Sequence, residues 1–303
     1  MSPVKRRFRR ACYHRLAVCL SWAVRRLPTG AGRRLCTALV QAGLRLRNRE
    51  RERARANLRL VFPELADTDR ERLLGRSAAA LGANLFDALT LDRWHARDYE
   101  GVSEDGAMAA LRDLRARGRG VLVLTGHFGC WELLGGYLAR GLAGLTVVTG
   151  TIHNPPVDRL VNDWRRGVGL TPVPREGGLR PLLQCLRGGG VAAVLLDQHT
   201  RVENVMVPFC GFPAPTPVGF ARLALKLGTP VLPVVIGRRG SGHRVTHLPP
   251  LEPGDYVGAG AVEDFLADCN AALETCLRRN PAEWVWFHAR WHVASKPGGS
   301  EPD

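Results

Sequence analysis

The chain lacks the cysteine spacing that marks zinc sites and disulfide-stapled domains. Its eight cysteines are scattered and form no C-x-x-C pair, so we expect neither a metal site nor a disulfide framework. Free thiols in this number are typical of proteins in a reducing compartment. Cys269 and Cys276 would share one helical face and are best explained as small core residues.

The chain also lacks a hydrophobic run long enough to cross a bilayer. The apolar run near the N-terminus covers residues 16–24 and is closed by Arg15 and Arg25. It is about half of the ~20 residues that a spanning helix requires. Because no small-residue cleavage site accompanies it, we do not expect a secretory signal either.

Acidic residues are scarce in the first sixty positions. This segment holds seventeen Lys and Arg against only Glu50 and Glu52, a net charge of +15. The whole chain also carries +15, so residues 61–303 balance at zero. The positive charge therefore belongs to one N-terminal segment, and an anionic partner is expected to bind there.

This basic segment has the pattern of a helix that lies on a membrane surface. Leu16, Cys19, Leu20 and Trp22 form an apolar stripe among the basic residues, and each cation near an anionic leaflet contributes about 1 kcal/mol. The alternative is a basic helix bound to nucleic acid. No aromatic interleaving, finger spacing or reading helix accompanies the charge, so we expect no nucleic-acid partner.

The remainder of the chain alternates apolar runs with helical patterns. Four runs without polar alternation predict buried parallel strands at residues 121–124, 145–148, 191–196 and 231–236. Helices are expected at residues 68–91, 104–117, 131–138, 157–168, 179–187, 221–227 and 262–279. The predicted fold class is α/β, with a mixed, mainly parallel central sheet flanked by helices and an N-terminal basic helical arm.

No internal repeat or linker divides this pattern. We therefore expect a basic arm at residues 1–60, one catalytic domain at 61–294 and a disordered tail at 295–303. Thr68 and Glu71 have the spacing of a capping box at the start of a helix. Pro233 indicates an edge strand or a bulge, and residues 207–217 have the composition of a proline-rich surface loop.

The stretch from Gly120 to Glu132 has the strongest chemical pattern. His127 follows a predicted strand and precedes a predicted helix, at the kind of turn where α/β sheets expose reactive groups. Glu132 is five residues later, about 500° around an uninterrupted helix, so the two side chains can meet only if Gly129 turns the chain. If they meet, the carboxylate orients the imidazole as a base. The alternative is a loop histidine and a glutamate that merely suits the first turn of a helix.

Two other features bear on the same site. Cys130 has no flanking cation beyond His127, so a thiolate nucleophile is not expected. Asp197 and Gln198 end another predicted strand, on the same edge of the sheet as His127, and we expect them to contact substrate. The aromatic residues at 284–291 are expected to line a binding cavity, to meet a membrane interface or to fill the core.

Together these stretches resemble the bacterial lipid A late acyltransferases and related glycolipid acyltransferases, such as those that act on phosphatidylinositol mannosides. The resemblance covers residues 53–291. It rests on the H-x4-E motif at 127–132, Pro-Arg-Glu-Gly-Gly at 174–178, Leu-Asp-Gln at 196–198, Val-Pro-Phe at 207–209 with Gly211, Thr-Pro at 216–217, residues 230–234 and the tryptophan-rich segment at 284–291. The motif at 127–132 alone is weak, but the full set in this order is specific.

The resemblance implies transfer of a fatty acyl group from acyl carrier protein or acyl-CoA to a hydroxyl of a membrane glycolipid, with no cofactor. His127 would be the general base and Glu132 its orienting acid. Arg175 is the candidate for binding a phosphate, and Glu176 either orients it or forms a surface ion pair.

The implied location is the cytoplasmic face of the bacterial inner membrane, held peripherally. The most direct expectation for the acceptor is a lipid A precursor; a phosphatidylinositol mannoside or another phospholipid or glycolipid is the alternative. A non-catalytic membrane- or nucleic-acid-binding protein is the alternative of a different class. Cys130 stands where the family often has Asn, and His199 where an acid is frequent, which bears on the substrate.

Overall fold

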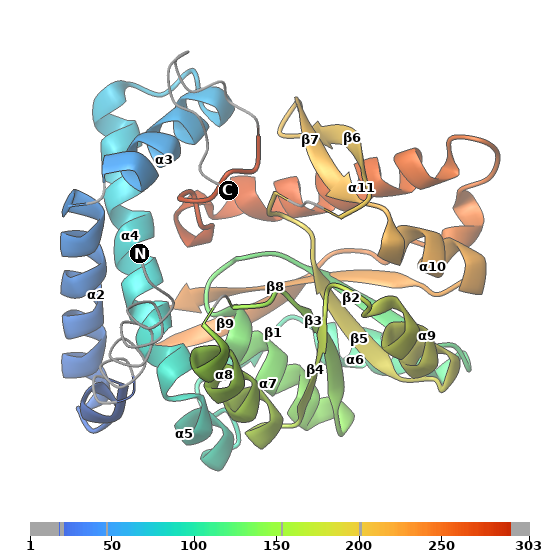
Figure 1. Cartoon of the computed structure of the whole chain (residues 1–303), viewed down its shortest axis with the longest axis horizontal. Helices are drawn as coiled ribbons and strands as arrows, with labels where there is room; N and C mark the ends of the chain where they lie inside the picture. The colour runs from blue at the N-terminus through green and yellow to red at the C-terminus, as the bar shows by residue number, and fades with distance from the viewer. Residues whose placement is uncertain (1–17, 19–20, 47, 153, 200–201, 292–303) are drawn as a thin grey trace, which may run out of the picture.

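A seven-stranded sheet forms the centre of the computed structural model (Figure 1), which describes residues 18, 21–46, 48–152, 154–199 and 202–291. The strand order is β1 (Val102–Glu104), β9 (Gly242–His247), β8 (Val231–Arg239), β2 (Val121–Thr125), β5 (Val191–Leu195), β3 (Leu145–Thr149) and β4 (Leu170–Pro174). Neighbouring strands run parallel except β8 and β9. The predicted fold class is therefore confirmed. The predicted C-terminal tail lies outside the described residues.

Successive side chains of the central strand β2 face opposite sides of the sheet, as the two-residue period of a strand requires. Leu122 and Leu124 belong to a core cluster that also contains residues of α9 (Leu179–Arg187), α10 (Gly219–Leu227) and α11 (Ala261–Arg279). Val121 and Val123 belong to a second cluster, with α6 (Ala107–Ala116) and α7 (Trp131–Leu142). Both faces are covered, which explains why residues 121–124 of β2 are all apolar.

The N-terminal part packs α2 (Thr29–Leu46) and α3 (Asn48–Val61) against α4 (Asp67–Leu89), and α5 (Leu91–Ala96) follows. The expected boundary at residue 60 falls within α3, whose Ala54 and Leu58 are fully buried in the main core. The predicted Thr68 cap is wrong: the helix begins at Asp67, and its N-cap residue Ala66 makes no side-chain bond.

The expected surface loop at residues 207–217 is also wrong. It forms a two-stranded antiparallel hairpin of β6 (Asn204–Phe209) and β7 (Phe212–Pro217), with Cys210 and Gly211 at positive φ in the turn. Prolines are tolerated because each strand of a two-stranded sheet is an edge. Phe209 is 1% exposed, so the hairpin contributes to the core.

Pro233 does not mark an edge strand, because β8 lies between β9 and β2 in the sheet. Proline lacks only the N–H group, and its carbonyl accepts a hydrogen bond from Leu248 N at 3.1 Å. Helix α8 (Pro155–Gly167) packs near the edge strand β4.

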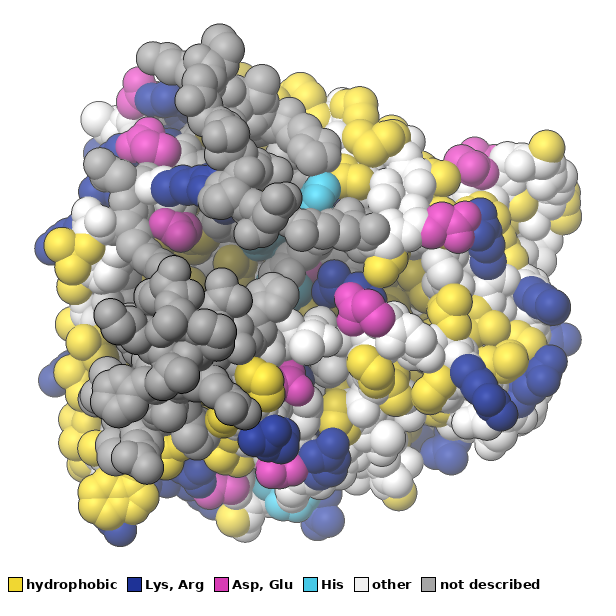
Figure 2. Space-filling view, in the orientation of Figure 1, with side chains coloured by type: hydrophobic (Ala, Val, Ile, Leu, Met, Phe, Trp, Pro, Cys, Tyr) yellow, Lys and Arg dark blue, Asp and Glu magenta, His cyan; other side chains and the backbone are white. Residues whose placement is uncertain are grey.

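The outer side of α2 is apolar. Figure 2 shows hydrophobic side chains down the left edge of the molecule, where Figure 1 places this helix. In the part of the chain that the structure describes, no helix combines the length and the hydrophobicity that crossing a membrane would require.

Candidate active site

The loop between β2 and α7 carries His127 at the carboxyl end of the central strand. Gly129 adopts φ +51°, a conformation that favours glycine, so the chain turns where the spacing required it. The C-terminal segment clamps this loop: Gly129 N donates to Glu283 O at 2.9 Å, and Val285 N donates to His127 O at 3.2 Å. The backbone that carries His127 is therefore held by two hydrogen bonds to the C-terminal segment.

His127 contacts Asp197, the residue that follows β5 by two positions. Nδ1 lies 2.8 Å from Asp197 Oδ1, and the His127 backbone N–H donates to Oδ2 at 2.6 Å. The register of the strands explains the contact, since Thr125 of β2 pairs with Leu195 of β5. His127 follows Thr125 by two residues and Asp197 follows Leu195 by two, so the two side chains come to lie next to each other.

Asp197 is fully buried and binds three donors. The third is the indole Nε1–H of Trp284, at 2.7 Å from Oδ2. Burial alone would raise the pKa of Asp197, but the charge and hydrogen bonds of His127, with a contribution from His288, hold it below its usual range. Asp197 is therefore a carboxylate at neutral pH. It can fix Nδ1–H of His127 as the donor and leave Nε2 as the basic nitrogen.

His288 completes the surroundings of Asp197. Its Nε2 lies 3.0 Å from the Asp197 carbonyl oxygen, and its ring centroid lies 5.9 Å from that of His127. Burial lowers the pKa of His288 to about 4, so this ring is neutral at pH 7. A neutral His288 donates to the carbonyl without placing a positive charge beside His127.

Glu132 has a different partner from the one that its spacing predicts. Its carboxylate is bound by both arms of the Arg165 guanidinium, with Nε 3.0 Å from Oε2 and Nη2 in closer contact with Oε1. Glu132 lies in the first turn of α7 and Arg165 in the last part of α8. The expected contact of Glu132 with the imidazole is thus corrected, because Asp197 already occupies Nδ1 and Arg165 binds Glu132.

His127, Glu132 and Arg165 nevertheless line one cavity of about 260 Å³. Arg175 and Glu203 are the other charged residues among those that line it. Most of the remaining wall is apolar and is supplied by the strand ends and by α7, α9 and α10. It includes Trp131, Val147, Val148, Leu170, Leu179, Leu182, Val194, Leu195, Leu196 and Phe220. Such a cavity suits a ligand with a long hydrocarbon part and a polar reacting end.

Of the other residues that were predicted to bind substrate, only Arg175 lines this cavity. Arg175 lines the cavity at the end of β4, with its backbone N–H bonded to Thr149 O at 2.9 Å. Glu176 is exposed and Gln198 half-buried, and neither lines this cavity. Asp197 lies behind His127 rather than in the wall, so its role is to hold the imidazole.

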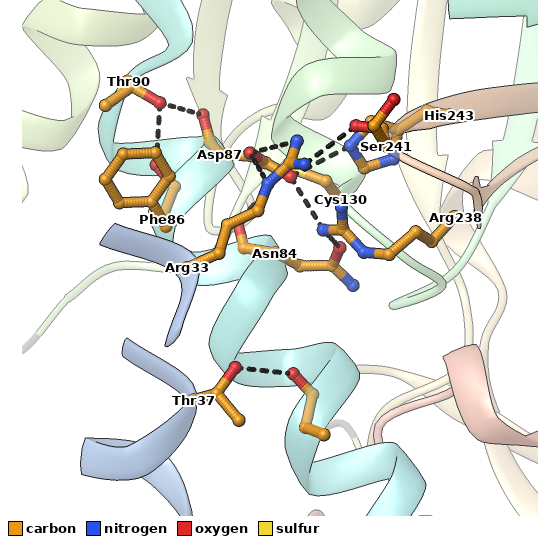
Figure 3. A network of polar contacts seen from close by, with 11 residues as sticks. Arg33, Thr37, Asn84, Phe86, Asp87, Thr90, Cys130, Arg238, Ser241 and His243 are labelled. Carbon is orange, nitrogen blue, oxygen red and sulfur yellow. Dashed lines mark hydrogen bonds and ion pairs between the residues drawn. The ribbon is translucent and has the colours of Figure 1, made fainter. Parts of the chain in front are cut away.

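Cys130 is buried and does not line the cavity. It is 2% exposed, its Sγ contacts the carbonyl of Asn84, and burial raises its pKa. Beside it lies a buried polar network centred on Asp87, which binds Arg33, Arg238 and His243 (Figure 3). A neutral thiol in this position cannot act as a nucleophile, in agreement with the sequence-based expectation.

The C-terminal aromatic residues belong to the core. Trp284 and Trp286 are 0% exposed, and Trp291 is 5% exposed. None of them lines the cavity, so the core interpretation is confirmed over the cavity wall. Trp284 has the additional task of binding Asp197, which the sequence did not indicate.

Arg165 was also missed, because no motif surrounds it and it lies 33 residues from Glu132. The basic residue in the last turn of an amphipathic helix usually serves the helix dipole. Among the described residues, no group of three or more His, Cys, Asp or Glu side chains is arranged to hold a metal ion.

Comparison with known proteins gives a consistent result. A family model described as bacterial lipid A biosynthesis acyltransferase matches residues 2–293. The chain is 27% identical to a lipid A biosynthesis lauroyltransferase of Escherichia coli K12 over 280 residues, 91% of this chain and 90% of that protein. It is 25% identical to the lipid A biosynthesis palmitoleoyltransferase of the same strain over 241 residues, 78% and 76% of the two chains.

A phosphatidylinositol mannoside acyltransferase of Mycobacterium tuberculosis H37Rv is 28% identical over a shorter stretch. It covers 192 residues, 61% of this chain and 59% of that protein. The similarity to the lipid A enzymes thus extends over more of the chain.

Proposed function

The chain belongs to the bacterial lipid A biosynthesis acyltransferase family, and we propose that it transfers a fatty acyl group from a thioester donor to a hydroxyl of a lipid A precursor. The observation that carries this proposal is the cavity of about 260 Å³ in which His127 meets an apolar wall. A hydrocarbon chain can lie along that wall while its carbonyl carbon is placed beside the imidazole.

The reaction begins with proton transfer to His127. Nε2 has no hydrogen-bond partner among the described residues, whereas Nδ1 is bound to Asp197. Nε2 takes the proton of the acceptor hydroxyl as its oxygen attacks the thioester carbonyl carbon. General-base assistance of this kind contributes about 10²–10⁴-fold. The negative charge of Asp197 stabilises the imidazolium that forms.

The intermediate then collapses with loss of the thiol. The C–O bond has formed, the C–S bond breaks, and the imidazolium returns the proton to the leaving thiolate. This sequence balances without an oxidant or a metal, because the thioester already supplies an activated acyl group. We therefore propose no cofactor, and acyl carrier protein or acyl-CoA as the donor.

Arg175 is proposed to bind a phosphate of the acceptor. It lines the cavity and has no carboxylate partner among the described residues, whereas Arg165 is already paired with Glu132. A guanidinium matches phosphate oxygens in a fork. The Glu132–Arg165 pair would hold the shape of the cavity wall. Contacts of Glu176 and Gln198 with substrate stay predictions.

The acceptor is a membrane lipid, so we propose peripheral attachment to an anionic membrane surface, on the cytoplasmic face of the inner membrane, with the basic N-terminal segment at the contact. That segment carries a net charge of +15 over residues 1–60. No role for nucleic acid is proposed.

Acyl transfer from labelled acyl carrier protein and acyl-CoA to a panel of lipid A precursors and phosphatidylinositol mannosides tests the proposal. Wild type should turn over a lipid A precursor, and His127→Ala should lose about 10²–10⁴-fold. His247→Ala is the matched control, because this histidine pairs with Asp105 away from the cavity. No turnover by folded wild type, or full activity of His127→Ala, would contradict the proposal; turnover only on mannosides would change the acceptor.

A further inference from the structure

Helix α2 is fixed on the body of the protein by close packing. Gly82 of α4 lies so close to Thr37 of α2 that a Cβ at position 82 would be 2.8 Å from the Thr37 backbone nitrogen. Arg33 adds an ion pair from α2 to the buried Asp87, with Nε 2.9 Å from Oδ1 (Figure 3). The helix therefore presents one defined face to the outside.

That outer face is apolar where a surface helix is normally polar. Leu35, Leu39 and Leu46 are 41%, 55% and 87% exposed, and Trp22, just before the helix, is 59% exposed. The exposed alanines at 31, 38 and 42 continue the row between the leucines, at the three- and four-residue spacing of one helical face. Figure 2 shows hydrophobic side chains along the lower part of the left edge, with Lys and Arg side chains between them. Contiguous exposed patches of this kind mark interaction sites.

The charges on helix α2 itself are all positive. The helix contains no acidic residue, and Arg34 in its second turn and Arg45 in its last turn are exposed. Before the helix, the guanidinium of exposed Arg26 lies 3.5 Å from the centroid of the Trp22 ring. Leucines and a tryptophan next to exposed arginines match the boundary between acyl chains and anionic headgroups.

We propose that the outer face of α2, together with Trp22, docks into the headgroup–acyl boundary of an anionic bilayer, with the helix axis parallel to the membrane. The helix has 18 residues, about 27 Å of contact along the surface. Its leucines enter the acyl boundary and its arginines bind lipid phosphates. The proposal rests on the proposed function only for the lipid nature of the acceptor, because docking requires no catalysis.

Vesicle co-sedimentation of the full chain tests this docking without any substrate. Wild type should bind phosphatidylglycerol/phosphatidylcholine vesicles and bind pure phosphatidylcholine more weakly. Leu35→Gln/Leu39→Gln should bind the anionic vesicles at least about tenfold more weakly. The matched control is Val257→Gln, which alters a residue that is 83% exposed in the loop before α11 and should bind like wild type.

Two further measurements separate membrane docking from loss of folding and from loss of catalysis. Arg34→Gln/Arg45→Gln removes only surface charge, so it should fold and lose preference for anionic vesicles even if the leucine variant does not fold. Acyl transfer to a detergent-dispersed acceptor should be unchanged in both variants, and transfer to a vesicle-embedded acceptor should fall with binding. Wild-type vesicle binding by the folded leucine variant would overturn the proposal. A wild-type dimer that this variant converts to monomers, with vesicle binding kept, would do the same.

Discussion

Asp197→Asn isolates the role of the carboxylate behind His127. Two donors, the His127 backbone N–H and Trp284 Nε1–H, converge on Oδ2 at 2.6 and 2.7 Å. An asparagine of the same shape must place its amide oxygen there, because its NH₂ group cannot accept a hydrogen bond. The NH₂ group then faces Nδ1 of His127. Nδ1 becomes an acceptor, the ring proton moves to Nε2, and the nitrogen that faces the substrate can no longer take a proton.

The expected loss is that of general-base catalysis, about 10²–10⁴-fold in kcat. At about 1.36 kcal/mol per tenfold change, this corresponds to ~2.7–5.4 kcal/mol of barrier height. KM should change little, since Asp197 is 0% exposed and does not line the cavity.

Steady-state acyl transfer with a fixed donor and varied acceptor measures both parameters. Thermal unfolding and far-ultraviolet circular dichroism control for folding. Glu132→Gln is the matched carboxylate-to-amide change at the Arg165 contact, and it should leave the His127 tautomer unaltered. A folded Asp197→Asn enzyme within about threefold of the wild-type kcat, or one affected only in KM, would refute the reasoning.

Three further results are expected. Gly126→Ala should abolish most transfer activity and lower the free energy of unfolding by about 1–3 kcal/mol in a urea titration, because the new Cβ would lie 2.7 Å from Asp197 Oδ2. The control is Gly75→Ala, which has no atom within 4 Å of the new Cβ and should be neutral or stabilising in the same titration. The pKa of His288 is about 4 in the folded protein, below its ordinary 6.5. Between these two pH values the unfolded chain therefore binds more protons than the folded one. As a result, the free energy of unfolding should fall as pH drops from about 6.5 to 4. His288→Gln should flatten that dependence in urea titrations at pH 7 and 5, and an unchanged slope would count against a buried neutral ring. Asp87→Ala should cost about 3–5 kcal/mol, since it removes the carboxylate that pairs with half-buried Arg33 and Arg238 and with buried His243; a loss below 1 kcal/mol by chemical denaturation would show that the network contributes little.

The main elements of the fold were predictable because apolar runs and glycines punctuate the chain. The strand at 121–124 and the helix at 179–187 appear where the pattern placed them. The β6–β7 hairpin was not predictable from composition, since its prolines are typical of loops and its stability comes from burial of residues such as Phe209. Pro233 likewise sits inside the sheet because only its missing N–H matters there.

The site was predictable in its location and only partly in its contacts. Parallel strands place their carboxyl ends together, so His127 and Asp197 were expected at one edge. Their direct contact depends on the register of β2 against β5, which no property of either strand alone specifies. The pairing of Glu132 with Arg165 depends on where α8 lies relative to α7. This placement is part of the tertiary structure, and no sequence motif indicates it.

Histidine-selective ¹⁵N NMR of the full-length protein measures the central claim most directly, namely that Asp197 fixes the His127 tautomer. Wild type at pH 7 should show His127 with a proton on Nδ1 and a bare Nε2, identified by the loss of its signals in His127→Ala. This tautomer should persist in Glu132→Gln and invert in Asp197→Asn. A proton on Nε2 in the wild type, or a tautomer that follows Glu132 rather than Asp197, would contradict the account.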